Sequence, residues 1–431
     1  LEEDALQTTQ DVLEVLNSCY DVNANVFNGR LQYSNELLGD NVAMLNESGD
    51  LGQIYNRNVS IFNGTVDNLL ADLYRTVFRC NRIEEVLGDF DFSEQEAARV
   101  LAEVQTLRAL SHFEIVKLWA QPAGYSSDNS HPGIIYRTNT EVRVLPRPTV
   151  AETYSNIIAD LTAALNSNGL PATSQYSLSA DAASAILAKV YFQQGDYANA
   201  LIYAENVVNS GAYSLDTVFD RFQPDTANIK EAIFKSRSYA PTIDYRSRAF
   251  TDNYRTDVPQ PPFLRASAEF YADYAEDTLD RRVTEFFQVN NPDSPDEFIG
   301  VRKFNKVYFD VAILHLTDIQ LLRAECLALL NQNLTTAIAD VNAIRERAYG
   351  NSSANLPAGT SAQALLDAIH KERRIEMFGE GDRTQQLKRR GAFEEPSLLI
   401  REVNWNCDGM ILQFPAVERT ELFAINPQGG C

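Results

Sequence analysis

The residues with the strongest chemical pattern lie in one stretch near the C-terminus, HKERRIEMFGEGDRTQQLKRRGAF, from His370 to Phe393. Residues three and four apart share one face of a helix, so acidic and basic side chains in this stretch can pair. Catalysis would require two carboxylates aimed at one substrate atom, whereas a structural role requires only opposite charges within hydrogen-bonding distance. Because each carboxylate has an arginine within one helical turn, we predict a structural role and no catalytic residue. The acidic residues are Glu372, Glu376 and Glu380, and the arginines that can reach them are Arg373, Arg374 and Arg383.

The same stretch could instead bind a polyanion, but its charges argue against this. Its surplus positive charge is confined to residues 388–390, and the rest is neutralised locally. The whole chain carries 59 acidic and 37 basic residues, a net charge of −22, which would repel a phosphate backbone or anionic lipid headgroups. We therefore expect no nucleic-acid partner.

The composition indicates a globular protein without a membrane span. With 45% hydrophobic residues over 431 positions, the chain can bury a large core. No apolar run approaches the roughly 18 to 20 residues that a spanning helix needs. The chain opens on LEEDALQTTQ, which has neither a basic nor an apolar targeting region, so we expect any signal sequence to have been removed already.

The cysteines give little sign of metal or redox chemistry. Five cysteines show no C-x-x-C spacing and only four histidines accompany them, so we predict no metal site and no cofactor. Cys326, in the helical run LLRAECLALL, is predicted to be a small buried hydrophobe rather than a reactive thiol. Cys407 and Cys431 lie in an irregular segment, where a disulfide would hold a tail that has few periodic apolar residues. We favour that bridge.

The elements that must position these residues are mostly helical. Amphipathic patterns run through TTQDVLEVLNSCYDVN, through residues 65–87, and through SEQEAARVLAEVQTLRALSHFEIVKLWA. The third pattern opens with Ser93 and Glu96 at the spacing of a capping box and ends before Pro122. A loop over residues 121–148, which contains proline and glycine, precedes a further helix in TVAETYSNIIADLTAALN.

Two segments have the pattern of tetratricopeptide-type helical hairpins. The first, residues 178–211, places small residues where two helices must approach closely, and the second, looser copy is LLRAECLALLNQNLTTAIADVNAIRERA. Between them lies a loop-rich insert with a few short strands. We predict one mainly α unit, residues 1–431, in which helical hairpins frame this insert. Its parts are a helical region 1–213, the insert 214–310, the second hairpin with the charged helix 311–395, and an irregular tail 396–431.

On these motifs the chain resembles the SusD/RagB family of Bacteroidetes surface lipoproteins. KERRIEMFGEGDRTQQLKRRG is similar to the family signature E-R-R-x-E-x-x-x-E-G-x-R-x-x-D-L-x-R-x-G, with Gln386 where the family has aspartate. AEVQTLRALSHFEIVKLW resembles the family's A-E-x-x-x-L-R-A helix, and FPAVERTELFAINP its closing P-I-P-x-x-E-x-x-x-N-P. The usual Q-N-P-G-Y ending is here Gln428-Gly429-Gly430-Cys431, which strengthens the prediction of a disulfide to Cys407.

The resemblance implies a SusD-like fold and a non-catalytic binding protein on the outer face of the outer membrane. Family members carry an N-terminal lipidated cysteine, which would lie upstream of Leu1. They cap a SusC-like TonB-dependent transporter and deliver a nutrient to it, usually an oligosaccharide or polysaccharide and sometimes a peptide. The hairpins would then dock on the transporter, and the insert would hold the ligand.

Candidate ligand residues follow from how proteins hold neutral sugars. Sugars stack their apolar faces on aromatic rings, while amides, carboxylates and arginines bind their hydroxyls. Trp119 is expected to pack inside the fold, and Trp405 could take either role. Stacking would therefore fall to tyrosine and phenylalanine of an early loop and of the insert. The predicted ligand residues are Tyr55, Asn56, Arg57, Tyr239, Tyr245, Arg246, Tyr254, Arg255 and Phe263.

Other functions remain open at this point. A peptide cargo on the same fold would suit the shortage of tryptophan and the arginines of the insert. A hydrolase on the helical frame would need a paired acid and base, which we do not find in the sequence. A plain repeat scaffold for other proteins would leave the long insert without a role.

Overall fold

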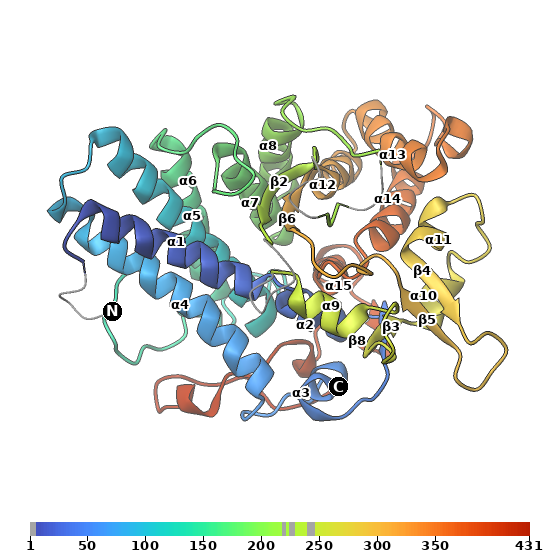
Figure 1. Ribbon diagram of the computed structural model, residues 1–431, viewed down its shortest axis with the longest axis horizontal. Coiled ribbons are helices and arrows are strands. Elements are labelled where there is room, and N and C mark those ends of the chain that lie inside the picture. Colours follow the sequence, from blue (N-terminus) through green and yellow to red (C-terminus); the bar gives the residue numbers. More distant parts are fainter. Residues whose placement is uncertain (1–5, 218–220, 224–228, 239–245) are drawn as a thin grey trace.

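Helices dominate the structure. The computed structural model describes residues 6–217, 221–223, 229–238 and 246–431. In Figure 1 the long helices fill one side and the upper edge of the molecule, while short strands and short helices gather on the other side. The predicted mainly α class with a loop-rich insert is confirmed.

Consecutive helices build the first part of the fold. They are α1 (Thr9–Val26), α2 (Arg30–Leu38), α3 (Gly49–Tyr55), α4 (Gly64–Val86), α5 (Glu94–Trp119) and α6 (Val150–Asn166). α1 packs on α4, α4 on α5, and α5 on α6. Ser93 Oγ accepts a hydrogen bond from the backbone N–H of Glu96 at 3.3 Å, so α5 begins at the predicted capping box.

The two predicted hairpins stack on each other although the insert separates them in the sequence. They are α7 (Ala180–Gln193) with α8 (Tyr197–Val208), and α12 (Leu316–Leu329) with α13 (Leu334–Tyr349). α8 packs against α12, which joins the hairpins into one layer along the upper edge of Figure 1. Ala200 and Ala204 of α8 are completely buried, as small residues must be where helices approach closely.

The insert contributes strands that pair with segments outside it. The strands are β1 (Val42–Met44), β2 (Ala232–Ser236), β3 (Leu264–Ala266), β4 (Phe287–Asn290), β5 (Phe298–Val301) and β6 (Val311–His315), with β7 (Leu399–Ile400) and β8 (Val403–Asn404) in the tail. One antiparallel sheet has the order β1-β3-β5-β4, and β2 pairs with β6 in another. Because β1 and β6 lie outside residues 214–310, the insert shares both sheets with the helical part.

Short helices and the charged helices complete the fold. They are α9 (Arg248–Tyr254), α10 (Ala268–Ala272), α11 (Arg281–Phe286), α14 (Ala362–Glu376) and α15 (Arg383–Phe393). A single large hydrophobic cluster runs from α1 to the C-terminal tail. Trp119 is completely buried in it, and Trp405 is buried as well with its Nε1 donating to Pro396 O at 3.2 Å, so both tryptophans pack inside the fold. Over the described residues, every helix is too short or too polar to cross a membrane.

Candidate functional site

The charged stretch forms α14, a tight turn and α15. Gly379 and Gly381 have φ values of +77° and +79°, a left-handed conformation that residues with side chains rarely adopt. A Cβ on Gly381 would also lie 2.9 Å from Gln32 Cα, so the turn needs glycine for its close approach to α2. The chain therefore reverses between α14 and α15, and Arg383 at the start of α15 pairs with Asp40, just beyond the end of α2.

Glu376 lies at the centre of a buried ion-pair network. Arginines from three distant segments bind its carboxylate: Arg221 Nη2 at 3.1 Å, Arg282 Nη1 at 3.2 Å and Arg347 Nη2 at 2.5 Å. Burial by itself would raise the pKa of Glu376, but the three arginines outweigh it and lower this pKa to about 2. The carboxylate is therefore ionised and fully neutralised by its neighbours.

Glu380 extends the network towards α12. Its Oε1 accepts a hydrogen bond from Lys303 Nζ at 2.5 Å, and its Oε2 lies 3.0 Å from His315 Nε2. Because His315 Nδ1 accepts from the backbone N–H of Asp318, its Nε2 carries the hydrogen donated to Glu380. Burial alone would raise the pKa of Glu380, but Arg221 and Lys303 hold it well below its usual range.

Arg373, Arg374 and Arg383 bind aspartates and not the glutamates of the stretch. The predicted pairing within one helical turn is wrong, because α2, α12 and the insert bring opposite charges to different sides of α14. The charged side chains of α14 are thus neutralised by residues of other segments and not by one another. The predicted structural role of these residues remains. The pairs are Arg373 with Asp318 and Asp382, and Arg374 and Arg383 with Asp40.

A glutamine replaces the aspartate of the signature without leaving a charge unpaired. Gln386 Oε1 accepts a hydrogen bond from Arg389 Nη2 at 3.2 Å, so an uncharged acceptor stands where the family has a carboxylate. The charge of Arg389 is met by Glu325 and Glu394. Side-chain atoms of Glu325, His370 and Glu394 lie within 4.8 Å of one another, which is close enough to hold a metal ion. Since the guanidinium of Arg389 already binds both glutamates, it supplies the positive charge there.

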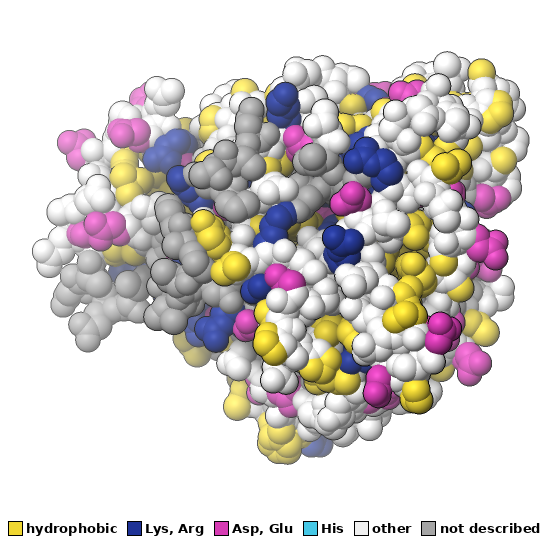
Figure 2. Space-filling view, turned by 45° about the vertical axis from the view of Figure 1, so that its right-hand side comes forward, with side chains coloured by type: hydrophobic (Ala, Val, Ile, Leu, Met, Phe, Trp, Pro, Cys, Tyr) yellow, Lys and Arg dark blue, Asp and Glu magenta, His cyan; other side chains and the backbone are white. Residues whose placement is uncertain are grey.

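β1 and β3 bring the early loop against the insert. Val42 pairs with Ala266, Met44 pairs with Leu264, and the backbone N–H of Leu45 donates to Phe263 O at 2.9 Å. We call the surface formed by residues 45–63 and 255–263 the rim. The side of the molecule that carries the short strands is turned forward in Figure 2, where hydrophobic side chains are interspersed with lysines and arginines. Leu45, Phe62 and Val258 are exposed hydrophobic residues of the rim.

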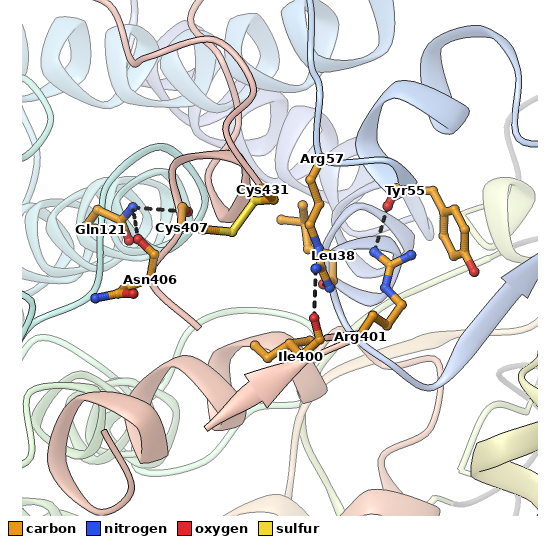
Figure 3. Close-up of a disulfide and its surroundings, with 9 residues drawn as sticks. All are labelled: Leu38, Tyr55, Arg57, Gln121, Ile400, Arg401, Asn406, Cys407 and Cys431. Carbon is orange, nitrogen blue, oxygen red and sulfur yellow. Dashed lines mark hydrogen bonds between the residues drawn. A yellow bond between two sulfur atoms is a disulfide. The ribbon is translucent and has the colours of Figure 1, made fainter. Parts of the chain in front are cut away.

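A disulfide fastens the irregular tail (Figure 3). Cys407 and Cys431 are bonded, as favoured from the sequence. The side-chain amide of Asn426 adds hydrogen bonds to Trp119 O at 2.9 Å and to Leu412 O at 2.7 Å. These contacts tie the tail to the end of α5 and give the neighbouring early loop a fixed support.

Arg57 belongs to this support and not to a ligand site. The residue is only 5% exposed, and its guanidinium donates to Ile400 O at 2.8 Å and to Leu38 O at 3.0 Å (Figure 3). The prediction that Arg57 contacts ligand is wrong. Its guanidinium donates hydrogen bonds to backbone carbonyls that would otherwise be buried without donors. Burial lowers the pKa of Arg57 to about 9.

Tyr55 and Asn56 are accessible parts of the same loop. Arg401 covers one side of the Tyr55 ring, with its guanidinium carbon 4.1 Å from the ring centroid, and also donates to Tyr55 O at 2.6 Å (Figure 3). The ring is half-buried, and Asn56 beside it is exposed. The Asn56 side-chain amide donates to Glu47 O at 3.4 Å, which leaves its Oδ1 beside an aromatic ring held in place by a cation, a suitable edge for a sugar.

Comparison with known proteins agrees with this architecture. Residues 1–192 match the family described as "Starch-binding associating with outer membrane", and residues 308–404, which include α14 and α15, match the "SusD family". The chain belongs to the SusD/RagB family. The resemblance found in the sequence is thereby confirmed.

SusD-like relatives match over most of their length. SusD-like protein P2 of Formosa agariphila is 24% identical over 90% of this chain and 85% of the relative. A SusD superfamily structure from Bacteroides thetaiotaomicron covers 98% of this chain and 100% of its own, with a TM-score of 0.84 at 21% identity. A surface glycan-binding protein A from Bacteroides uniformis has a TM-score of 0.77 at 18% identity, and the match covers 95% of this chain and 97% of that one. The SusD-like fold is therefore shared along nearly the whole chain.

In this SusD-like chain the predicted ligand residues of the insert lie in different environments, some in the core and some at the surface. Tyr254 is 0% exposed, and its ring packs 5.1 Å from that of Phe304. The prediction that Tyr254 contacts ligand is wrong, because α9 turns this residue into the core. Arg255 and Phe263 are half-buried on the rim, where Arg255 pairs with Asp257 at 2.8 Å.

Arg246 lies elsewhere. Its guanidinium pairs with Asp21 and with Asn25 Oδ1, both of α1. Tyr239 and Tyr245 lie outside the described residues. Tyr55 and Asn56 therefore lie in one segment of the rim and Arg255 and Phe263 in the other, whereas Arg246 lies against α1.

Sequence reasoning missed two hollows of the surface. One, of about 410 Å³, runs beside α4 and is bordered by Tyr74, Phe78 and Phe414. The other, of about 270 Å³, lies between α1 and β2 and has Arg246 on its wall. Each hollow combines segments far apart along the chain, so no local motif could have indicated it.

Proposed function

We propose that this chain is a non-catalytic glycan-binding protein on the outer face of the outer membrane. The observation that carries the proposal is the rim, an irregular surface with exposed hydrophobic residues that is braced from behind by Arg57, Arg401 and the disulfide. Irregular segments on a rigid frame are where binding residues usually lie. Support also comes from the matched family, described as starch-binding and associating with the outer membrane, and from the glycan-binding protein of Bacteroides uniformis.

The interior chemistry supports binding without catalysis. Glu376 and Glu380 are each bound by several cations, so neither is available as a general acid or base. Burial raises the pKa of Glu36 to about 8, which would suit an acid. Glu36 is, however, completely buried beneath the turn at Gly381, whose N–H donates to it at 3.0 Å, so a glycan on the surface does not reach it.

We further propose that the bound glycan is an oligosaccharide or polysaccharide delivered to a SusC-like TonB-dependent transporter. The anchor would be a lipid on a cysteine upstream of Leu1. α7, α8, α12 and α13 stack into one continuous layer, which is a surface suited to docking on such a transporter. The rim would then hold the nutrient.

Peptide cargo is less well supported than glycan cargo. The arginines that would favour an acidic peptide are paired with aspartates: Arg246 with Asp21, and Arg255 with Asp257 at 2.8 Å. Paired arginines and aspartates offer both donors and acceptors, which suits the hydroxyls of a neutral sugar. Tyr55, Asn56, Arg255 and Phe263 are the residues that we propose to contact it.

A glycan and peptide array followed by calorimetry tests the proposal. Replacing Tyr55 or Phe263 with alanine should weaken binding of the best glycan by about tenfold, as for the loss of one stacked aromatic contact. Leu422→Ala, at an exposed hydrophobic residue of the tail outside the rim, is the matched control and should bind normally. Peptides bound in place of glycans, or products released from the glycan over time, would contradict the proposal. Co-purification with a SusC-like transporter tests the partner separately.

A further inference from the structure

The larger hollow of the surface is a groove of about 410 Å³ along α4. Residues three and four apart on α4 line it from Asp67 to Asn81, so one face of this helix forms its base. The loop 137–142 and the tail segment 414–423 complete the lining. Three segments far apart in the sequence therefore form one groove, and its lining residues belong neither to the rim nor to the hairpin helices α7, α8, α12 and α13.

Contacts with neighbouring residues hold the loop and the tail in place. The carboxylate of Glu85 accepts hydrogen bonds from the backbone N–H and the hydroxyl of Thr140, both at 2.7 Å, which fixes the loop to the end of α4. In the tail, the rings of Phe414 and Phe423 pack with their centroids 4.9 Å apart, and the guanidinium carbon of Arg147 lies 4.9 Å from the Phe414 centroid. The groove is therefore formed before a partner binds, which lowers the entropic cost of binding.

The groove has an apolar base and exposed apolar edges. Leu70 and Val77 of α4 and Phe414 of the tail are buried lining residues. Val142 and Val417, which also line the groove, are 96% and 85% exposed, the highest values for large hydrophobic side chains in the described part of the chain. Single exposed hydrophobic residues are ordinary, but a group of them around an apolar groove is typical of a protein-binding surface. Side chains this exposed stand at the mouth of the groove, where a partner protein buries them and a small ligand does not.

Acidic residues outnumber basic residues around the groove. Its lining has Asp67, Glu141 and Glu418 against one basic residue, Arg137, whose guanidinium donates to nearby backbone carbonyls at 3.3 and 2.9 Å. Among the described residues, the carboxylates of Asp67 and Glu418 have no hydrogen-bond or ion-pair partner. Burial, and then the charge of Asp50, raise the pKa of Asp67, so a cation beside this carboxylate would be favourable. The groove therefore suits a partner that carries lysine or arginine next to apolar side chains.

We infer that this groove docks an apolar segment of the SusC-like transporter that is flanked by lysine or arginine. The inference rests on the proposed function, which supplies the transporter as the protein partner, and it adds a contact that the layer of hairpin helices does not provide. Because the groove and the rim share no residue, the transporter in the groove and the nutrient on the rim are bound by separate parts of the chain.

Docking is tested with the SusC-like transporter that co-purifies with the native chain. In a variant that combines Val142→Ser with Val417→Ser, the affinity for the purified transporter should fall about tenfold, because two apolar contacts are lost. The melting temperature should stay native, since both side chains are exposed in the free protein. Leu279→Ser is the matched control. Leu279 is a 69% exposed hydrophobic residue between α10 and α11, outside the groove, the rim and the hairpin helices, so this variant should bind the transporter normally.

Glu418→Lys tests the charge of the groove. Reversing this charge should weaken transporter binding about tenfold at low salt, and the difference from the native protein should shrink as salt is added, because exposed charges are screened. Glu276→Lys changes an exposed glutamate in the same turn as Leu279, and as the control it should bind normally. Equal losses in Glu276→Lys and Glu418→Lys would show that only the overall charge matters and would reject the groove as the docking site.

Native affinity for the transporter in both groove variants would overturn the inference and leave the proposed transporter partner standing. Weaker glycan binding in these variants, with transporter binding unchanged, would assign the groove to the ligand. Self-association of the native chain that the variants abolish, again with transporter binding unchanged, would assign the groove to a second copy. Either result would reject docking of the transporter here. If no SusC-like transporter binds the native chain, the proposed partner fails and this inference fails with it.

Discussion

Arg221 Nη2 lies 3.1 Å from Glu376 Oε1, although the two residues are 155 positions apart and both side chains are completely buried. The same guanidinium lies 3.4 Å from Glu380. One arginine of the insert thus pairs with two carboxylates, one at the end of α14 and one in the turn that follows it. It therefore couples the insert to the helical frame through charge as well as through packing.

Arg221→Met should lower the free energy of unfolding by about 3–5 kcal/mol, because it leaves buried carboxylates without this partner. Urea unfolding followed by circular dichroism measures the change. Arg248→Ala is the control: Arg248 and Asp252 are both more than half exposed, with Nε and Oδ2 3.2 Å apart, so the loss of this pair should cost at most about 1 kcal/mol. Equal losses in the two variants would show that the buried network contributes no more than a surface pair.

Three buried titratable groups should make the stability of the protein depend on pH. Burial lowers the pKa of His112 from its ordinary 6.5 to about 3, so the unfolded chain takes up a proton first and stability falls as pH drops from 6.5 towards 3. Burial alone would raise the pKa of Glu376, but its arginines lower this pKa from the ordinary 4.5 to about 2. The ionised carboxylate therefore stabilises the fold fully above pH 4.5, and this stabilisation is lost as the pH falls to 2. Between pH 6.5 and 4.5 Glu36 opposes this effect, because burial raises its pKa to about 8 and the folded state holds a proton that the unfolded chain has lost. Melting temperatures should therefore change little from pH 6.5 to 4.5 and fall below 4.5, whereas in Glu36→Gln they should fall over the whole range. A melting temperature of Glu36→Gln that stays constant from pH 6.5 to 4.5 would show that His112 is not held neutral.

Lys388→Met should stabilise the protein at neutral pH by roughly 1–3 kcal/mol. Lys388 is buried and donates to Lys117 O at 3.1 Å; burial, and then the charge of Lys117, lower its pKa to about 7. The Lys388 amine therefore binds a proton less tightly in the folded state than in the unfolded state, which lowers the free energy of unfolding. This destabilisation is at its maximum below pH 7 and disappears above the ordinary pKa of 10.5. The difference in melting temperature between variant and native protein should be larger at pH 7 than at pH 10. A difference independent of pH would refute this explanation.

Replacements of Tyr254 should affect stability and leave ligand binding unchanged. Its hydroxyl is buried and has no hydrogen-bond partner within the described part of the chain, so Tyr254→Phe should be neutral or stabilising by up to about 1 kcal/mol. Tyr254→Ala should cost about 3–5 kcal/mol, because it empties a packed position beside Phe304. Thermal unfolding measures both, and calorimetry of Tyr254→Phe with the best glycan should give the native affinity. Weakened binding in that variant would place Tyr254 in a ligand site after all.

Local features of the fold could be read from the sequence, because they depend on neighbours a few residues apart. The capping box at Ser93 and the hairpin formed by α7 and α8 both follow from spacing and residue type alone. The signature around Glu376 likewise indicated the family and a structural role.

The partners of those residues and the composition of the site were decided only by the tertiary structure. Periodicity shows that a side chain is turned inward but not which distant charge it meets, so Arg221 could not be assigned to Glu376 from the sequence. Tyr254 ends the short helix α9 and Arg57 follows the short helix α3, and no repeating pattern there distinguishes a buried residue from a ligand contact. The hollow between α1 and β2 likewise exists only because segments far apart in the sequence fold against one another. Burial and ion pairing between distant segments depend on the packed chain as a whole, and that is the physical reason why they appear only in the folded protein.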